Sequence, residues 1–195
     1  MAAGTIGQIA TPAAGNRVPP GVEWVADNAV FAGNYPGDAE YLAWLAQRAD
    51  RAAWCRFVVA PDVVADAAAT LALSLPMLPR IRALGFPAAL VAQDGLERLD
   101  VPWDAFDCLF IGGSTEWKLG PAARRLTAEA KRRGKWVHMG RVNSRQRLLY
   151  ASAIGCDSVD GTYLAFGPER NLPTLLSWLR ELDWPALFDH PEGAA

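Results

Sequence analysis

The chain has 195 residues, of which 51% are hydrophobic and 21% are charged, a balance that supports one folded domain with its own core. The formal net charge of −2 provides no basic field, which argues against a protein that binds nucleic acid by charge alone. No apolar stretch approaches the length of about 20 residues that crosses a bilayer, and the first residues lack a secretory signal, so we expect a cytoplasmic protein without a membrane partner.

Short apolar runs alternate with longer amphipathic stretches along the chain, which is typical of a βα fold. The seven runs that predict strands are 5–10, 22–26, 57–60, 88–92, 108–111, 136–139 and 158–159. The stretches that predict helices are 38–52, 65–83, 121–133, 144–154 and 172–181. We therefore predict an α/β fold, a small (β/α) TIM-type barrel that is incomplete at about seven strands.

Prolines, glycines and one serine mark where these elements begin and end. Ser144 is expected to cap a helix, Pro121 suits a first helical turn, and Pro76 and Pro79 are expected to break or kink the helix at 65–83. We expect residues 1–195 to form a single barrel domain, with an irregular loop at 11–20 and an irregular tail at 183–195.

Acidic residues stand at or just after the ends of four predicted strands: Asp27, Asp62, Glu116 and Asp160. In a barrel of parallel strands, the carboxyl ends open onto one face, so these side chains are expected to converge on one small ligand. This pattern indicates an enzyme. The cysteines and histidines have no zinc-like spacing, so we predict neither a metal site nor a cofactor.

Three stretches of the second half carry a recognisable order of motifs. A strand ends in Gly112-Gly113, the next ends in Met139-Gly140, and a helix then leads to an Asp-Ser-Val-Asp sequence that ends at Asp160. Upstream, the turn from Asp27 to Phe31, Pro61-Asp62 and the sequence Gln93-Asp94-Gly95 fall at corresponding strand ends. Together they resemble the queuine/archaeosine tRNA-guanine transglycosylase superfamily, and most closely its short phage and bacterial branch that acts on 7-deazaguanines in DNA.

The resemblance implies a glycosyltransferase that exchanges guanine for a 7-deazaguanine such as preQ0 in DNA, through a covalent bond between an aspartate and the sugar. It implies that DNA and the free 7-deazaguanine base are partners; tRNA is less favoured, because the family's Cys/His zinc subdomain has no counterpart here. A homodimer or a partner subunit is expected to cover the open edges of an incomplete barrel.

By the same resemblance, Asp160 is the nucleophile and Asp27 is the acid–base group. Arg141 and Asn143 are added because they lie in the loop after a strand, and Glu116 and Lys118 are both kept as pocket candidates. The predicted substrate-binding residues are therefore Asp62, Gln93, Gly112, Gly113, Glu116, Met139, Gly140, Arg141 and Asn143.

Structural roles compete with these functional ones. Asp160 could stabilise a turn, Asp27 an Asx-turn, Asp62 the start of a helix, and Gln93 an ordinary turn, while Glu116 could pair with Lys118 on the surface. His138 is more readily explained as a buried, hydrogen-bonded side chain than as a catalytic one.

Three other functions stay open at this point. The same purine pocket could serve a purine- or deazapurine-binding protein, or an N-glycosidase without exchange. An unrelated barrel enzyme that acts on a small sugar phosphate is a further alternative.

Overall fold

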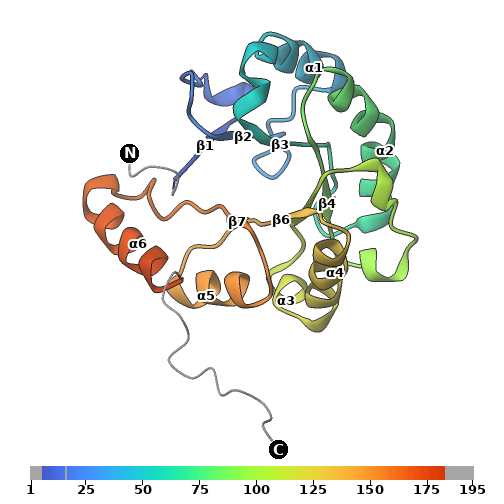
Figure 1. Ribbon diagram of the computed structural model, residues 1–195. Coiled ribbons are helices and arrows are strands. Elements are labelled where there is room, and N and C mark those ends of the chain that lie inside the picture. The colour runs from blue at the N-terminus through green and yellow to red at the C-terminus, as the bar shows by residue number, and fades with distance from the viewer. Residues whose placement is uncertain (1–5, 16, 183–195) are drawn as a thin grey trace, which may run out of the picture.

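Seven parallel strands in sequence order form the centre of the protein in the computed structural model, which describes residues 6–15 and 17–182. Each strand pairs with the next one along the chain, and the sheet curls into a half-barrel that stays open between its first and last strands (Figure 1). This confirms the predicted α/β barrel of about seven strands. The strands are β1 (Gln8–Ala10), β2 (Trp24–Ala26), β3 (Cys55–Val59), β4 (Ala88–Ala92), β5 (Cys108–Ile111), β6 (Trp136–Met139) and β7 (Ser158–Val159).

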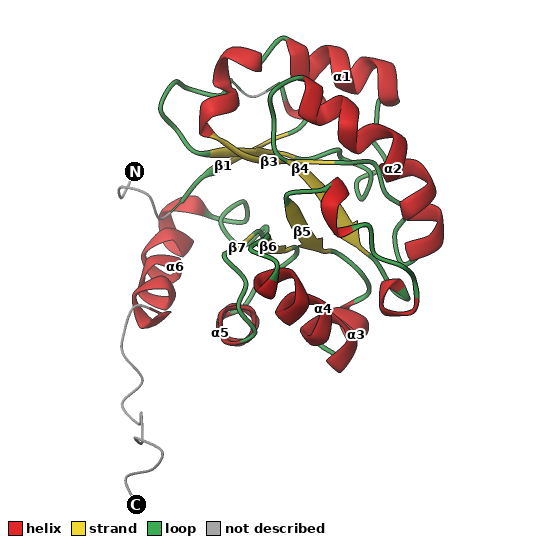
Figure 2. Cartoon of the chain, turned by 45° about the vertical axis from the view of Figure 1, so that its right-hand side comes forward, coloured by secondary structure: helices red, strands yellow, loops and turns green. Residues whose placement is uncertain are grey.

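Helices surround the outer face of the curled sheet (Figure 2). In the described residues these are α1 (Asp38–Ala46), α2 (Ala67–Ala83), α3 (Thr115–Lys118), α4 (Pro121–Arg132), α5 (Arg145–Ala153) and α6 (Pro168–Leu182). Four short 3-10 helices lie in the connections, at Pro12–Ala14, Ala49–Trp54, Leu96–Arg98 and Trp103–Ala105. No helix of the described part of the chain is long and apolar enough to cross a membrane.

The predicted helix at 38–52 is divided in the structure. The α-helix ends at Ala46, and the chain continues as the 3-10 helix Ala49–Trp54. The carbonyl oxygen of Arg51 accepts a hydrogen bond from the indole nitrogen of Trp24 at 3.0 Å, so a contact with β2 helps to set the path of this segment. Such a tertiary contact overrides the local helical pattern.

The expected break in the second helix was wrong, because α2 runs through both Pro76 and Pro79. Both prolines are exposed, whereas Met77, Leu78 and Ile81 are fully buried against the sheet. Packing of this apolar face supplies much of a helix's stability and here compensates for the missing backbone donors.

Two apolar layers hold the barrel together. Inside the curl, Phe57, Val59, Ala89, Val91 and Cys108 form a small cluster. A larger layer lies between the strands and the helices and includes Val58, Leu90, Leu109 and Met139. Successive side chains on a strand point to opposite faces, so this division fixes which side chains reach the barrel interior.

The predicted loop at 11–20 contains one turn of 3-10 helix, and the side-chain oxygen of Thr11 accepts a hydrogen bond from the backbone nitrogen of Ala14. The predicted tail at 183–195 lies outside the described residues. The expected single domain and the expected homodimer or partner subunit stay predictions.

Candidate functional site

Polar residues follow the strands at the carboxyl end of the half-barrel. Asp27 follows β2, Asp62 lies shortly after β3, Gln93 follows β4, Gly140 follows β6 and Asp160 follows β7. Because the strands are parallel and consecutive, their ends surround one opening, which we call the mouth.

Asp160 is held by groups from β6 and the loop after it. Its Oδ2 lies 3.0 Å from Nε2 of His138, and its Oδ1 accepts a hydrogen bond from the backbone nitrogen of Arg141 at 2.9 Å. Burial by itself would raise the pKa of Asp160. The hydrogen bond and charge of His138, the Arg141 amide and the charge of Lys118 outweigh burial, so the pKa is lowered. Asp160 is thus stabilised as a carboxylate.

His138 lies inside the barrel with only 3% of its surface exposed. Its ring packs between Phe57 and Phe110, with ring centroids 5.0 and 4.6 Å away. Nδ1 lies 2.8 Å from Oγ of Ser158, so both ring nitrogens have partners within β7 and its end. The expectation of a buried, hydrogen-bonded histidine agrees with this environment, and its contact with Asp160 places it directly behind the site.

The surroundings of Asp27 shift its pKa in the opposite direction from that of Asp160. Burial raises its pKa, and the negative charges of Asp160 and Asp62 raise it further, although a hydrogen bond from the Ala29 backbone nitrogen at 2.7 Å and the charge of His138 act against this. The bond to Ala29 is the Asx-turn that the sequence offered as an alternative role. Asp27 therefore forms the turn and also presents a carboxyl group that holds its proton more tightly than usual.

Asp62 belongs to a chain of hydrogen bonds along the mouth. Its two oxygens accept hydrogen bonds from Asn28 Nδ2 at 2.8 Å and from Gln93 Nε2 at 2.6 Å, and Gln93 Oε1 accepts one from the Gly113 backbone nitrogen at 3.0 Å. Burial raises the pKa of Asp62 despite these hydrogen bonds. The expected helix cap is a different residue, since Asp66 caps α2.

Two cationic side chains join the loops after β5 and β6. Lys118 is 1% exposed, and its Nζ donates a hydrogen bond to the Gly140 carbonyl at 2.6 Å. Burial lowers the pKa of Lys118 to about 8. From the loop after β6, the guanidinium of Arg141 donates hydrogen bonds to the carbonyls of Gly112 and Gly113, which follow β5.

The backbone of Arg141 has φ +60°, a left-handed conformation that is costly for a side chain of this size. This conformation aims the Arg141 amide at Asp160 while the guanidinium lies over the ring of Phe31, 4.8 Å from the ring centroid. Phe31 is 66% exposed, so this pair from the β2 and β6 loops covers part of the mouth from outside.

Three predicted binding residues lie elsewhere. Met139 is fully buried between the sheet and the helices, on the opposite side of β6 from His138. Glu116 is exposed on α3. Lys118 is buried and its Nζ donates a hydrogen bond to the Gly140 carbonyl, so the alternative of a surface pair with Glu116 is not formed. Asn143 is exposed and accepts a hydrogen bond from the Thr162 backbone nitrogen at 2.6 Å, so it shapes the loop after β7.

Packing explains why the two residues that follow β5 are glycines. A Cβ on Gly112 would lie 2.5 Å from Cγ1 of Val91, and one on Gly113 would lie 2.4 Å from the ring of Trp117. The Gly113 amide is already used by Gln93. These glycines are needed for the close approach of neighbouring elements, whereas the resemblance implied that they bind the substrate.

His138, Lys118 and Asn28 also lie at the mouth but are not among the predicted site residues, although the sequence kept Lys118 as a pocket candidate with Glu116. All three are at most 3% exposed and hydrogen-bonded to predicted site residues or their backbone. Two of them had features in the sequence that could have indicated a role. Asn28 is next to Asp27, and His138 is a titratable residue within an apolar strand. Among residues 6–15 and 17–182, no group of three or more His, Cys, Asp or Glu side chains is arranged to hold a metal ion.

No family model and no curated protein matches the chain. Among solved structures, the chain is similar to the PaMucR phosphodiesterase in complex with c-di-GMP, with 14% identity and a TM-score of 0.44, covering 73% of this chain and 60% of that one. It is also similar to a chain described as a glycerophosphoryl diester phosphodiesterase from Silicibacter pomeroyi DSS-3, with 16% identity and a TM-score of 0.46, covering 80% of this chain and 51% of that one. The chain thus spans less than two thirds of either solved chain.

These findings correct the family expected from the motifs, because the similar structures are phosphodiesterases of another kind of barrel and not tRNA-guanine transglycosylases. The expected base exchange, and the purine-binding and N-glycosidase alternatives built on the same pocket, lose their basis with it. The physical reason lies in the motifs themselves. Strand-end acids, an Asx-turn at Asp27 and glycines that permit close packing arise in parallel barrels from geometry, and they do not specify one chemistry.

Proposed function

We propose that this chain is a hydrolase of phosphodiesters that works by general acid–base catalysis at the mouth. The observation that carries the proposal is the opposite pKa shift of two carboxyl groups at the same end of the barrel. The pKa of Asp160 is lowered and that of Asp27 is raised. Two carboxyl groups whose surroundings separate their pKa values are suited to act as a base and an acid.

The charges around Asp160 favour an anionic substrate. After burial, the charges of Arg141 and Arg147 also lower the pKa of Lys118, while the charge of Asp160 raises it, so three cations and this carboxylate lie near one another. Burial raises the pKa of Asp27 and of Asp62, which disfavours their charged forms. A phosphodiester carries one negative charge, and arginine is well matched to phosphate oxygens, so Arg141 is the group that binds it.

In the proposed reaction, Asp160 accepts a proton from a water molecule as the water oxygen forms a bond to phosphorus. The bond from phosphorus to the leaving oxygen breaks, and Asp27 donates its proton to that oxygen. The products are a phosphomonoester and an alcohol. Proton exchange with solvent returns both carboxyl groups to their starting states.

His138 serves this reaction as a positioning residue. Both of its ring nitrogens are engaged, one with Ser158 and one with Asp160, so it holds the base and does not reach the substrate. Asp62 and Gln93 likewise fix the wall of the mouth between β3 and β4 through the 2.6 Å hydrogen bond between them.

The experiment is hydrolysis of bis(4-nitrophenyl) phosphate by the purified protein and by the Asp160→Asn variant, followed through release of 4-nitrophenol. We expect the variant to be slower by about 10²- to 10⁴-fold, the usual contribution of a general base. Asp66→Asn is the matched control, because asparagine caps a helix as well as aspartate does and the exposed Asp66 side chain accepts its hydrogen bond from the Ala69 backbone nitrogen of α2. No hydrolysis by the wild type, or equal rates for wild type and Asp160→Asn, would refute the proposal.

The nucleic-acid partner expected from the sequence stays a prediction, as does the cytoplasmic location. The proposed reaction requires only that a phosphodiester reaches the mouth, and a panel of small and polymeric diesters in the same assay would distinguish these substrates.

A further inference from the structure

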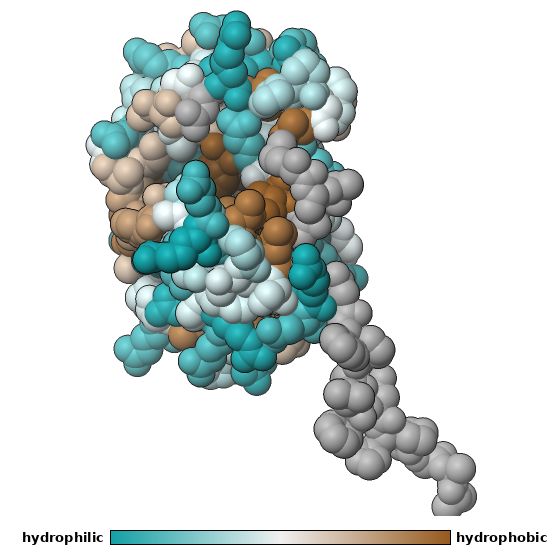
Figure 3. All heavy atoms as spheres, turned by 90° about the vertical axis from the view of Figure 1, so that its left-hand side faces the viewer, coloured by the Kyte–Doolittle hydropathy of each residue, from teal (hydrophilic) through white to brown (hydrophobic). Residues whose placement is uncertain are grey.

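The half-barrel is open along one side. In the described chain β1 pairs only with β2, and β7 pairs only with β6, so an opening remains between β1 and β7, which we call the seam. A cavity of about 690 Å³ lies in the seam, which is within the range of about 300–1,000 Å³ that small-molecule sites occupy. Figure 3 shows this side of the molecule, where hydrophobic residues gather in a hollow.

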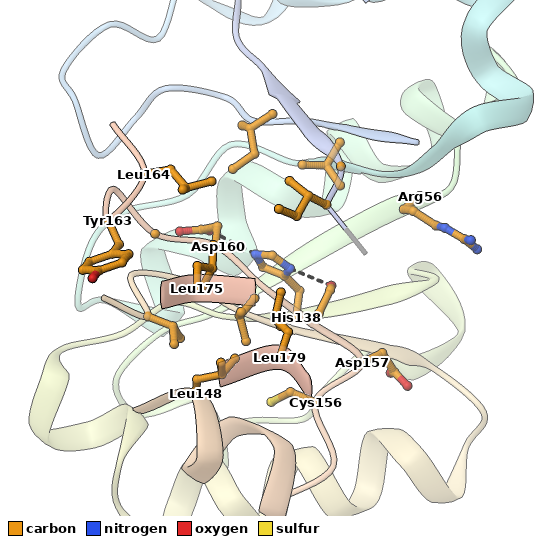
Figure 4. A pocket seen from close by; sticks show the side chains of 18 of the residues that line it. Arg56, His138, Leu148, Cys156, Asp157, Asp160, Tyr163, Leu164, Leu175 and Leu179 are labelled. Carbon is orange, nitrogen blue, oxygen red and sulfur yellow. Dashed lines mark hydrogen bonds and ion pairs between the residues drawn. The ribbon is translucent and has the colours of Figure 1, made fainter. Parts of the chain in front are cut away.

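The seam cavity is continuous with the mouth. Asp160 and His138 both line it, and Figure 4 shows their side chains in the same cavity as Leu164, Leu175 and Leu179. A ligand held at the mouth by its charged group therefore has a path into the seam.

The walls of the seam cavity are mainly apolar. Leu148 of α5 and Leu175, Trp178 and Leu179 of α6 line one side, and Ile9 of β1 contributes from another strand. The charged groups that line its other parts have partners of opposite charge, since Arg56 pairs with Glu23 and Asp157 pairs with Lys131. The cavity is thus lined mainly by apolar surface. The carboxylate of Asp160 lies near one end of it.

We propose that the seam binds a hydrocarbon chain attached to the phosphodiester, so that the substrate is an amphiphile with its phosphate at the mouth. The identity of the head group rests on the proposed function. A strand from a second copy is disfavoured as the occupant, because β1 has three residues and β7 has two, which offer few backbone hydrogen bonds for sheet extension.

The test is binding of n-alkyl phosphates with four to fourteen carbons, measured by titration calorimetry. These monoesters resemble the product and contain no diester bond. Burial of one more methylene is expected to lower Kd about fourfold until the cavity is filled. A Kd that does not change with chain length in the wild type would overturn the proposal, whatever the variants do.

A matched pair of variants locates the binding. Leu179→Glu places a charge in the wall of the seam, while Leu172→Glu makes the same change on α6 at an exposed residue that does not line the cavity. We expect the dependence on chain length to disappear in Leu179→Glu and to persist in Leu172→Glu, with circular dichroism confirming the fold of both. Equal dependence in the two variants would place the chain elsewhere and overturn the proposal.

These experiments distinguish three results: a second copy bound in the seam, failure of the seam proposal alone, and failure of the proposed reaction alone. A concentration-dependent dimer in sedimentation that Leu179→Glu dissociates, with no dependence of Kd on chain length, would assign the seam to a second copy. A wild-type Kd that does not depend on chain length, with intact hydrolysis of bis(4-nitrophenyl) phosphate, refutes only the seam proposal. Strong chain-length dependence without hydrolysis of any diester refutes only the proposed reaction.

Discussion

Asp27 and Asp160 carry the same functional group, but their neighbours differ. Asp160 has a histidine, a backbone amide and a lysine to stabilise its charge, whereas Asp27 is buried near two other carboxyl groups. Burial disfavours the charged form of both, and only Asp160 has enough opposing interactions to reverse the effect. The different roles that we propose for them follow from these surroundings.

Lys118 is the residue whose removal tests this electrostatic argument. A cation beside a carboxylate favours the charged form and lowers the pKa, so Lys118→Met should raise the pKa of Asp160. The base would then be ionised only at higher pH, and the acid limb of the pH dependence of kcat/KM is expected to move to higher pH. The measurement is the pH–rate profile of the variant on bis(4-nitrophenyl) phosphate.

Lys131→Met is the control for that profile, because the Lys131 side chain pairs with Asp157 on the surface at 2.6 Å. Its acid limb should match that of the wild type. An unmoved acid limb in a folded Lys118→Met variant would show that Lys118 does not tune the base.

At single residues, the sequence predicts the acids of the mouth but not the groups behind them. Asp27, Asp62 and Asp160 were found because strand ends are recognisable and parallel strands end together, whereas Gln93 was predicted from the family resemblance. Met139 was predicted from the Met139-Gly140 motif of the resemblance. The direction of the His138 side chain was left open, because a strand buried on both faces has no alternation of polar and apolar residues to show which side chain points inward.

Among the helices, α5 connects the site to local sequence signals most directly. Ser144 caps it as predicted, and its Oγ accepts a hydrogen bond from the Arg147 backbone nitrogen at 3.3 Å. Arg147 in turn donates a hydrogen bond to the Arg141 carbonyl at 3.4 Å, so the first turn of α5 supports the loop that holds Asp160.

Loss of this cap should therefore weaken the fold. Ser144→Ala is expected to lower the free energy of unfolding by about 1 kcal/mol, since it leaves an amide of the first turn without its partner. Urea denaturation measures the effect. Ser144→Asp should retain most of the stability because aspartate is an equally good cap, and a Ser144→Ala variant as stable as the wild type would show that the cap contributes nothing.

Elements with strong local patterns were predicted well and those shaped by distant contacts were not. Four strands, β4 to β7, have the predicted bounds, because each is a short apolar run bounded by turn residues. The division of the helix at 38–52 and the continuity of α2 through its prolines depend on packing against the sheet, which no local pattern contains.

For the whole molecule, the count of seven strands was the most informative prediction. It implied an opening in the barrel, and the structure has a cavity of about 690 Å³ there, next to Asp160. The family resemblance was not confirmed, because the features that carried it serve the barrel's own packing and turns. A barrel fold accommodates many chemistries, so the reaction has to be argued from the site.

The role of Asp27 as the acid gives the most direct test of the proposed reaction. The measurement compares Asp27→Asn with the wild type on methyl 4-nitrophenyl phosphate and on diethyl phosphate, by phosphorus NMR. Nitrophenolate leaves without a proton, whereas ethoxide needs one, so the variant should be slower by about 10²- to 10⁴-fold on diethyl phosphate and nearly unchanged on the nitrophenyl ester. Asp160→Asn should slow both reactions. Equal losses on the two substrates in Asp27→Asn, or no loss on either, would contradict the assignment of Asp27 as the acid and Asp160 as the base.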